Sequence, residues 1–183
     1  MSLVFLVRHG DYDYQDTAPD TVGKRLTGTG IKQAEATAVW FENIDHDVDL
    51  ILSSDYKRAA QTAEIIGAVY PGVPFQTSTD LRECVDVYSR DRPLAFQTAS
   101  AAYKRLFATP GPRLQATIVV CHANLIRYFL SRLQRWSRKR WEDAVIGNCS
   151  ISAVELADGR RPAVQYAASE EHLPTHLRER RWQ

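Results

Sequence analysis

The feature that most constrains the fold is the alternation of short apolar runs with longer helical repeats. Runs rich in β-branched residues, such as LVFLVR (3–8) and ATIVVC (116–121), predict buried strands. Between such runs, apolar residues recur every three or four positions, as in residues 29–44, which predicts amphipathic helices. Strands that alternate with helices build a mainly parallel sheet covered on both faces. We therefore expect a three-layer α/β/α sandwich, mainly parallel, with an antiparallel edge strand.

The same pattern predicts the approximate bounds of the elements. The expected strands are residues 3–8, 49–54, 73–76, 116–121, 150–156 and 162–167, and the expected helices are residues 29–44, 56–70, 93–107 and a helix after residue 122. In the first helix, Ile31, Ala34, Ala38 and Phe41 share the face that we expect to be buried. No linker or repeat divides the chain, so we expect a single domain over residues 1–183, with a flexible tail from about residue 170.

The cysteines and the absence of targeting signals point to a reducing compartment. Cys84, Cys121 and Cys149 are odd in number and do not form a CxxC pair, which predicts free thiols. No apolar run approaches the roughly 20 residues of a membrane span, and no secretory signal is visible. We expect a cytoplasmic protein without a membrane span.

A net charge of +1 conceals an uneven distribution of charge. Residues 1–91 hold 8 Lys and Arg against 15 Asp and Glu, whereas residues 92–183 hold 15 against 7. The basic half includes RLQRWSRKRW (132–141), which is either a solvated helix face or a surface that attracts phosphoproteins, nucleic acid or acidic membranes.

Polar residues at the predicted strand ends form a candidate site. Arg8 and His9 end the first strand, and His122 follows the strand at 116–121. Arg58 follows the second strand in the first turn of its helix, and Glu83 lies in an irregular stretch further on. Ligands of open α/β sheets bind beyond the carboxyl ends of the strands. Because guanidinium groups bind tetrahedral phosphate bidentately, these residues predict a phosphate site with one proton donor.

Five motifs in sequence order show a family resemblance. They are RHG (8–10), LTGTGIKQA (26–34), SSDYKRAAQTA (53–63), LRE (81–83) and VVCHAN (119–124). On these motifs the chain resembles the histidine phosphatase superfamily, in its phosphoglycerate mutase-like branch. Within that branch, HANLIRYFL (122–130) and NCSI (148–151) are similar to the mitochondrial mutase-like Ser/Thr protein phosphatases.

The resemblance implies a role for each matching residue. His9 matches the phosphorylated nucleophile, and Arg8 and Arg58 match the residues that hold the phosphoryl oxygens. His122 matches the second histidine, which contacts the transferring group. Glu83 matches the proton donor.

Three further residues have less certain roles. Asp11, directly after the RHG motif, is an alternative proton donor to Glu83. Gln15 stands near the position where the mutases carry an Asn that contacts phosphate, so we expect a phosphate contact there but no mutase activity. Asn124 contacts phosphate, orients His122 or caps the following helix.

These features predict a phosphomonoesterase that needs no cofactor and no metal, since guanidinium groups supply the positive charge. The substrate is expected to be a phosphoprotein, and a protein Ser/Thr phosphatase is the leading interpretation. The alternatives are a small-molecule phosphatase acting on sugar or nucleotide phosphates, and a catalytically silent phosphate-binding module. We expect no nucleic-acid partner, and a homodimer is compatible with the sequence.

Overall fold

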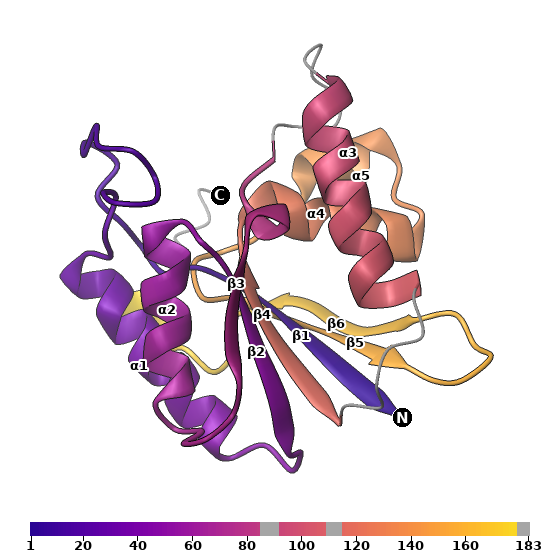
Figure 1. Cartoon of the computed structure of the whole chain (residues 1–183), viewed down its shortest axis with the longest axis horizontal. Helices are drawn as coiled ribbons and strands as arrows, with labels where there is room; N and C mark the ends of the chain where they lie inside the picture. The colour runs from indigo at the N-terminus through magenta and orange to yellow at the C-terminus, as the bar shows by residue number, and fades with distance from the viewer. Residues whose placement is uncertain (85–91, 109–114, 179–183) are drawn as a thin grey trace.

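A mixed β-sheet forms the centre of the protein in the computed structural model, which describes residues 1–84, 92–108 and 115–178 (Figure 1). Within these residues the sheet has six strands in the order β3-β2-β4-β1-β5-β6. The strands are β1 (Ser2–Arg8), β2 (Val48–Ser54), β3 (Phe75–Ser78), β4 (Ala116–Cys121), β5 (Ile151–Leu156) and β6 (Ala163–Ser169). Each lies within two residues of a predicted strand at both ends.

Strand β1 has a central position in the sheet. It pairs in parallel with β4, placing Arg8 opposite Cys121, and antiparallel with β5, placing Val7 opposite Ile151. Strand β2 pairs in parallel with both β3 and β4, whereas β5 and β6 form an antiparallel hairpin. The predicted mainly parallel sheet is therefore confirmed, and its antiparallel part comprises the two strands β5 and β6.

Helices cover both faces of this sheet, which confirms the predicted three layers (Figure 1). One face carries α1 (Gly28–Glu42) and α2 (Lys57–Gly67), and the other carries α3 (Arg92–Tyr103), α4 (Ala123–Gln134) and α5 (Arg138–Asp143). Short turns of other helix types are η1 (Thr79–Leu81), η2 (Lys104–Ala108) and η3 (Thr175–Leu177). The Thr27 hydroxyl caps α1 by accepting a hydrogen bond from the Gly30 N–H at 3.1 Å.

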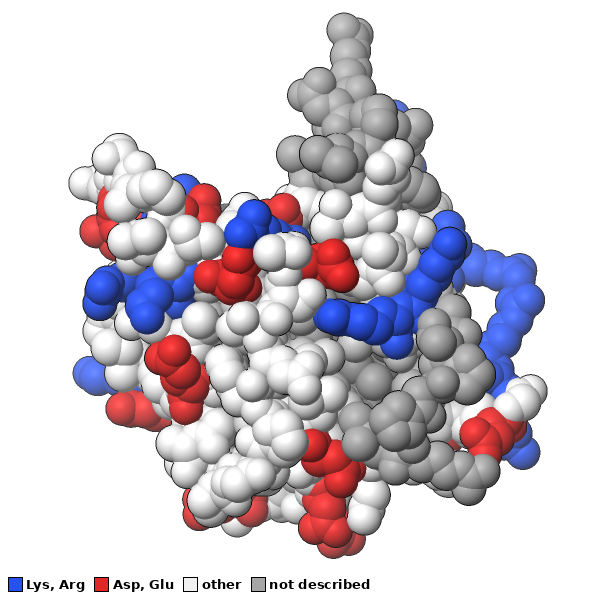
Figure 2. All heavy atoms as spheres, in the orientation of Figure 1, with Lys and Arg blue, Asp and Glu red and all other residues white. Residues whose placement is uncertain are grey.

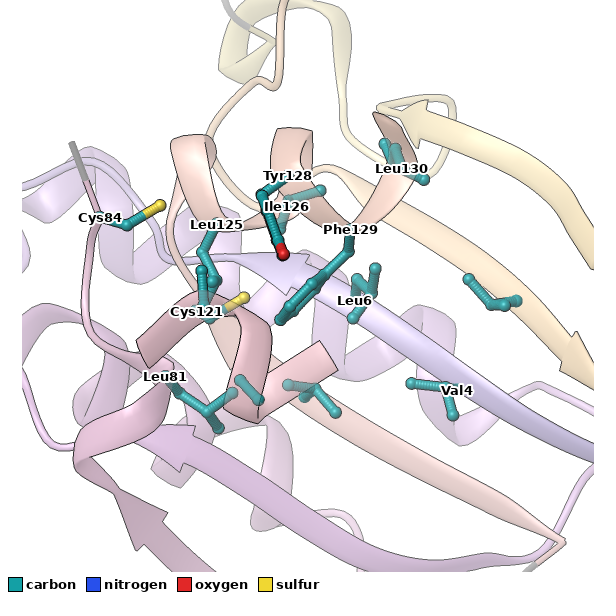
Figure 3. Close-up of a cluster of buried hydrophobic side chains, with 14 of the residues drawn as sticks. Val4, Leu6, Leu81, Cys84, Cys121, Leu125, Ile126, Tyr128, Phe129 and Leu130 are labelled. Atoms are coloured by element: carbon teal, nitrogen blue, oxygen red, sulfur yellow. The ribbon is translucent and has the colours of Figure 1, made fainter. Parts of the chain in front are cut away.

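Successive side chains of β1 belong to two separate hydrophobic clusters, because residues of a strand alternate between its faces. Val4 and Leu6 pack with α3 and α4, whereas Phe5 and Val7 pack with α1 and α2. Figure 3 shows Phe129 of α4 beside Leu6 in the first cluster. The two clusters share the strands between them, so the sheet is held from both sides.

The buried face of α1 differs from the predicted one. Ala34, Ala38 and Phe41 are buried as expected, but Ile31 is 40% exposed. Gln33 is buried in its place, because its side chain accepts a hydrogen bond from the Asp11 N–H and donates one to a backbone carbonyl.

The predicted flexible tail also needs correction for residues 170–178. Leu173 and Leu177 are buried, and the Leu177 carbonyl accepts a hydrogen bond from Gln33 at 2.8 Å. The Arg178 side chain donates to the carbonyls of Leu173 and Glu171. Two apolar side chains thus anchor this segment, although its mostly polar composition predicted that it would be flexible. Residues 179–183 lie outside the described residues.

Candidate active site

The parallel strands bring the two predicted histidines together. His9 follows β1 and His122 follows β4, and since Arg8 and Cys121 are paired, both histidines lie at the same edge of the sheet. Their ring centroids are 5.0 Å apart. Both side chains are buried.

His9 has a fixed ring orientation. Its Nδ1 lies 2.8 Å from the carbonyl oxygen of Gly10, which can only accept, so Nδ1 carries the proton. Its Nε2 then has the lone pair and accepts a hydrogen bond from Arg58 Nε at 3.3 Å. The imidazole is held in the tautomer that a nucleophilic nitrogen requires.

The segment 146–149 forms hydrogen bonds with the residues at the end of β1. Asn148 Nδ2 donates to the His9 carbonyl at 2.9 Å, and the Cys149 N–H donates to the Arg8 carbonyl at 3.0 Å. The Arg8 guanidinium donates to the Ile146 carbonyl at 2.6 Å. These bonds fix the backbone of both residues and one end of the Arg8 side chain.

Arg58 connects the groups of the cluster. Besides His9, its guanidinium faces His122 Nδ1 at 3.4 Å from Nη2, and its Nη1 forms an ion pair with Asp20. The guanidinium carbon also lies 4.6 Å from the centre of the Tyr12 ring. This buried cation is therefore oriented from three sides.

His122 takes the opposite tautomer to His9. A guanidinium has donors only, so His122 Nδ1 accepts from Arg58. Nε2 then carries the proton, which it donates to Ser54 Oγ at 2.9 Å. Ser54 ends β2, so three neighbouring strand ends contribute to one hydrogen-bonded cluster.

Both histidines are neutral near pH 7. Burial, together with the positive charge of Arg8, lowers the pKa of His9 well below its usual 6.5. Burial, with further contributions from His9 and Arg58, lowers the pKa of His122 in the same way. Neutral rings keep their lone pairs available, and positive charge resides on the guanidinium groups.

Glu83 combines a fixed position with a raised pKa. Its Oε1 accepts hydrogen bonds from the N–H groups of Cys84 at 3.0 Å and Asn124 at 3.2 Å. Burial raises the pKa of the carboxyl group to about 7, against the lowering effect of the Cys84 hydrogen bond and of the charges of Arg8 and Arg58. A carboxyl group of this kind can both donate and accept a proton near neutral pH.

The alternative donor, Asp11, has a different environment. Its Oδ2 accepts a hydrogen bond from the Thr27 hydroxyl at 2.6 Å, and its backbone bonds to Thr27 and Gln33. These contacts link the loop after β1 to the start of α1. They give Asp11 a structural role in addition to any role at the site.

Gln15 and Asn124 do not join the cluster through their side chains. Gln15 is exposed, and within the described residues no hydrogen bond links its side chain to the cluster. The Asn124 side chain accepts from Arg127 at 2.9 Å, and its backbone N–H is the part that reaches Glu83. The N-cap of α4 is His122, so the predicted capping role of Asn124 is wrong.

Three contacts of the site were not predicted from the sequence. Asp20 lies in a loop without a motif, and its contact with Arg58 depends on the path of that loop. Asn148 belongs to a motif, but its bond to His9 spans 139 positions in the chain. Ser54 ends a predicted strand beside the two histidines, and this position was the one available signal.

The carboxyl edge of this mainly parallel sheet holds two neutral histidines, two arginines and a carboxyl group of raised pKa. This combination is typical of α/β proteins that bind phosphate groups. The chain belongs to the histidine phosphatase superfamily. The model of branch 1 of this superfamily matches residues 4–105 and 95–169.

Curated relatives extend over most of the chain. A mitochondrial Ser/Thr-protein phosphatase, Pgam5, of Caenorhabditis elegans is 31% identical over 186 residues, covering 93% of this chain. The human protein of that name is 27% identical over the same share of the chain. The chain spans 64% of the length of the nematode protein and 63% of the human one.

Solved structures share the fold. A phosphoglycerate mutase of Plasmodium falciparum superposes with a TM-score of 0.69 at 28% identity, covering 95% of this chain and 94% of that one. The protein histidine phosphatase SixA, in complex with tungstate, has a TM-score of 0.67 at 22% identity, covering 90% and 94%. These likenesses confirm the predicted phosphoglycerate mutase-like fold.

The names of the relatives correct one expectation. The cysteine pattern predicts a cytoplasmic protein, but the relatives are named mitochondrial, which contradicts that location. Free thiols indicate reducing conditions and do not identify the compartment. In the part of the chain that the structure describes, no helix has the length and hydropathy needed to cross a membrane.

Proposed function

We propose that this chain hydrolyses phosphate monoesters through a phosphohistidine intermediate on His9, and that its substrates are phosphorylated Ser and Thr side chains of proteins. The observation that carries the proposal is the geometry of His9. Its Nδ1 donates to the Gly10 carbonyl, and the lone pair of its Nε2 faces the cationic cluster, where it accepts a hydrogen bond from Arg58. The second half of the proposal is supported by relatives named Ser/Thr-protein phosphatases.

In the first step, His9 Nε2 forms a bond to phosphorus while the bond between phosphorus and the ester oxygen breaks. Protonated Glu83 donates its proton to the leaving oxygen, giving a free hydroxyl group. Arg58 Nε loses its acceptor on His9 as the N–P bond forms, and can then donate to a phosphoryl oxygen. Arg8 contributes further contacts to the transferring group, and His122 helps to hold Arg58 in place.

In the second step, the ionised Glu83 takes a proton from water. The water oxygen forms a bond to phosphorus, the N–P bond breaks, and inorganic phosphate leaves. The proton is again on Glu83 and the lone pair is again on His9, so the enzyme is regenerated. A pKa of about 7 lets Glu83 perform both transfers.

The proposed chemistry requires no metal or cofactor. Arg8 and Arg58 carry the positive charge that stabilises the dispersed charge of the transferring phosphoryl group. Hydrolysis of p-nitrophenyl phosphate should therefore continue in excess EDTA.

The central test replaces the nucleophile. His9→Ala should lower kcat for p-nitrophenyl phosphate by about a thousandfold or more, since it removes the nitrogen that accepts the phosphoryl group. The matched control is His46→Ala, which removes an exposed histidine and should leave kcat unchanged. An active His9→Ala protein, or activity lost in EDTA, would contradict the mechanism.

The substrate class needs a separate measurement. We expect kcat/KM to be higher for phosphoserine and phosphothreonine peptides than for a panel of sugar and nucleotide phosphates. The opposite ranking would leave the phosphohistidine mechanism in place and make the chain a small-molecule phosphatase. A protein that binds phosphate with no turnover of any substrate would instead be a binding module.

A further inference from the structure

A second cavity, of about 480 Å³, lies outside the cluster around His9. Its walls come from the last residue of α3 (Tyr103), the last turn of α4 (Ser131, Arg132 and Arg135) and the residues that precede β6 (Arg161 and Pro162). A volume of about 300–1,000 Å³ is typical of sites for small molecules. None of the phosphatase chemistry described above uses these residues.

The cavity lies at the end of the sheet opposite to the active site. Helix α4 begins beside His122, and Arg132, ten residues further on, lies about 15 Å along the helix axis at a rise of about 1.5 Å per residue. Strand β6 begins at Ala163, opposite Glu155, and Glu155 in turn pairs with Leu3 near the start of β1. His9 follows the other end of β1. A molecule bound in the cavity would therefore leave the phosphatase site accessible.

Among the described residues, no carboxylate neutralises the positive charge in the cavity. Within the described residues, Arg132, Arg135 and Arg161 form no ion pair, and no Asp or Glu lines the cavity. Asp158, on the turn between β5 and β6, is outside its lining. Figure 2 shows Lys and Arg side chains projecting at the edge of the molecule that carries this turn.

The nearby helix α5 provides a contrast. There Arg138 pairs with Glu142 at 2.7 Å and Lys139 pairs with Asp143 at 2.9 Å. The basic stretch predicted from the sequence thus divides into two parts. Arg138 and Lys139 are neutralised on α5, whereas Arg132 and Arg135 join Arg161 in the cavity.

The backbone of Arg135 adds an independent observation. It has a φ of +53° at the C-cap of α4, in the left-handed region, where glycine is the favoured residue. Strained positions of this kind are enriched at ligand sites. An arginine therefore occupies a position at the edge of the cavity where glycine would be less strained. Arg132 already provides a cation for the C-terminal end of the helix, so this role does not require Arg135.

We propose that this cavity binds a polyphosphate group, either free or carried by a nucleoside di- or triphosphate. Three guanidinium groups match several closely spaced phosphate oxygens, which a single phosphate would not fully occupy. Tyr103 and Pro162 supply an apolar wall for an organic moiety, and the Arg132 guanidinium already lies 5.5 Å from the centre of the Tyr103 ring.

The experiment measures binding calorimetrically on the His9→Ala protein, so that the ligand is not consumed. The probes are ATP, inorganic tripolyphosphate and, as a single-phosphate comparison, AMP. We expect ATP and tripolyphosphate to bind at least tenfold more tightly than AMP. Equal affinity for all three, or no binding of ATP at 1 mM, would overturn the proposal.

Charge-matched variants locate the site. R132Q/R135Q/R161Q should weaken ATP binding at least tenfold, whereas R138Q/K139Q/R140Q, which removes the same number of charges nearby, should change it less than twofold. Adding Arg58→Gln should also have little effect. Equal losses in the two triple variants would mean attraction by a basic surface only. A loss confined to Arg58→Gln would place the ligand in the phosphatase site. Each of these two results would reject the proposed binding site in the cavity.

Arg135→Gly separates ligand binding from folding. Glycine relieves the strain at a φ of +53°, so the ligand-free protein should melt about 2–3 °C higher. The rise in Tm caused by ATP should nevertheless shrink in this variant, because one guanidinium is missing. An undiminished rise would show that Arg135 does not contact the ligand.

Discussion

At the scale of single residues, Arg58 is the point on which the site converges. One guanidinium donates to His9 and His122 and pairs with Asp20. The sequence predicted His9, His122 and both arginines because each follows a strand or begins a helix at the carboxyl edge of the sheet. Asp20 and Asn148 were not predicted, because their contacts depend on loop paths that no local pattern encodes.

Asp20 should act as a positioning residue for Arg58. Hydrogen bonds from Arg58 and Lys24 outweigh the effect of burial and lower the pKa of Asp20, so this residue is ionised at neutral pH. Asp20→Ala should lower kcat/KM for p-nitrophenyl phosphate about tenfold, or ~1.4 kcal/mol, because Arg58 loses one of its three restraints. Steady-state kinetics would measure this loss.

The conservative variants separate positioning from general damage to the loop. Asp20→Glu should recover part of the lost kcat/KM, since a carboxylate can still reach the guanidinium. Asp13→Asn, on the exposed part of the same loop, is the control and should behave like wild type. Equal effects of the Asp13 and Asp20 variants would refute the positioning role.

Glu83 should determine how activity depends on pH. A general acid acts only when protonated, and burial raises the Glu83 pKa to about 7. For an alkyl phosphate, whose leaving oxygen needs a proton, log kcat/KM should therefore fall as the pH rises through about 7. Profiles of kcat/KM from pH 5 to 9 would show this.

The variants of the two candidate donors decide between them. Glu83→Gln should abolish the fall above pH 7 and reduce activity on alkyl phosphates more than on p-nitrophenyl phosphate, whose leaving group departs without a proton. Asp11→Asn should keep the fall. The reverse pattern would assign the proton to Asp11.

At the scale of elements, the strands were predicted closely because buried parallel strands are short apolar runs with sharp ends. The helix faces were predicted less well. Ile31 is exposed while Gln33 is buried, because Gln33 forms two hydrogen bonds to distant parts of the backbone that hydropathy cannot anticipate. The packing of the segment after residue 170 was not predicted for a similar reason, since it depends on two apolar side chains.

The junction between α1 and the loop after β1 should tolerate no side chain at Gly30. A Cβ there would lie 2.0 Å from the Asp11 carbonyl oxygen, whereas a Cβ at Gly28 meets nothing within 4 Å. Gly30→Ala should lower the free energy of unfolding by about 2–3 kcal/mol, because the backbone must move. Gly28→Ala, in the first turn of the same helix, should be neutral or slightly stabilising. Urea unfolding of both variants measures the difference, and equal stabilities would contradict the close approach.

At the scale of the whole molecule, the two hydrophobic clusters should unfold together. Phe5→Ala and Leu6→Ala remove side chains from opposite faces of β1, and each should lower the free energy of unfolding by about 3–5 kcal/mol. Because both clusters use the same strands, urea transitions followed by circular dichroism and by tryptophan fluorescence should coincide. Separate transitions would contradict the single domain, which stays a prediction from the sequence.

Self-association also stays a prediction. Light scattering on the wild-type protein would measure its mass in solution. A monomer at all concentrations would exclude the homodimer.

The central position of β1 has a consequence for biosynthesis. The ribosome makes this strand before its two neighbours, which are residues 116–121 and 151–156. At about 5–20 residues per second, β1 waits roughly 8–30 s before both partners have been synthesised. During that interval the nascent chain exposes an unpaired apolar strand, and chaperones that shield it should therefore control the yield of soluble protein.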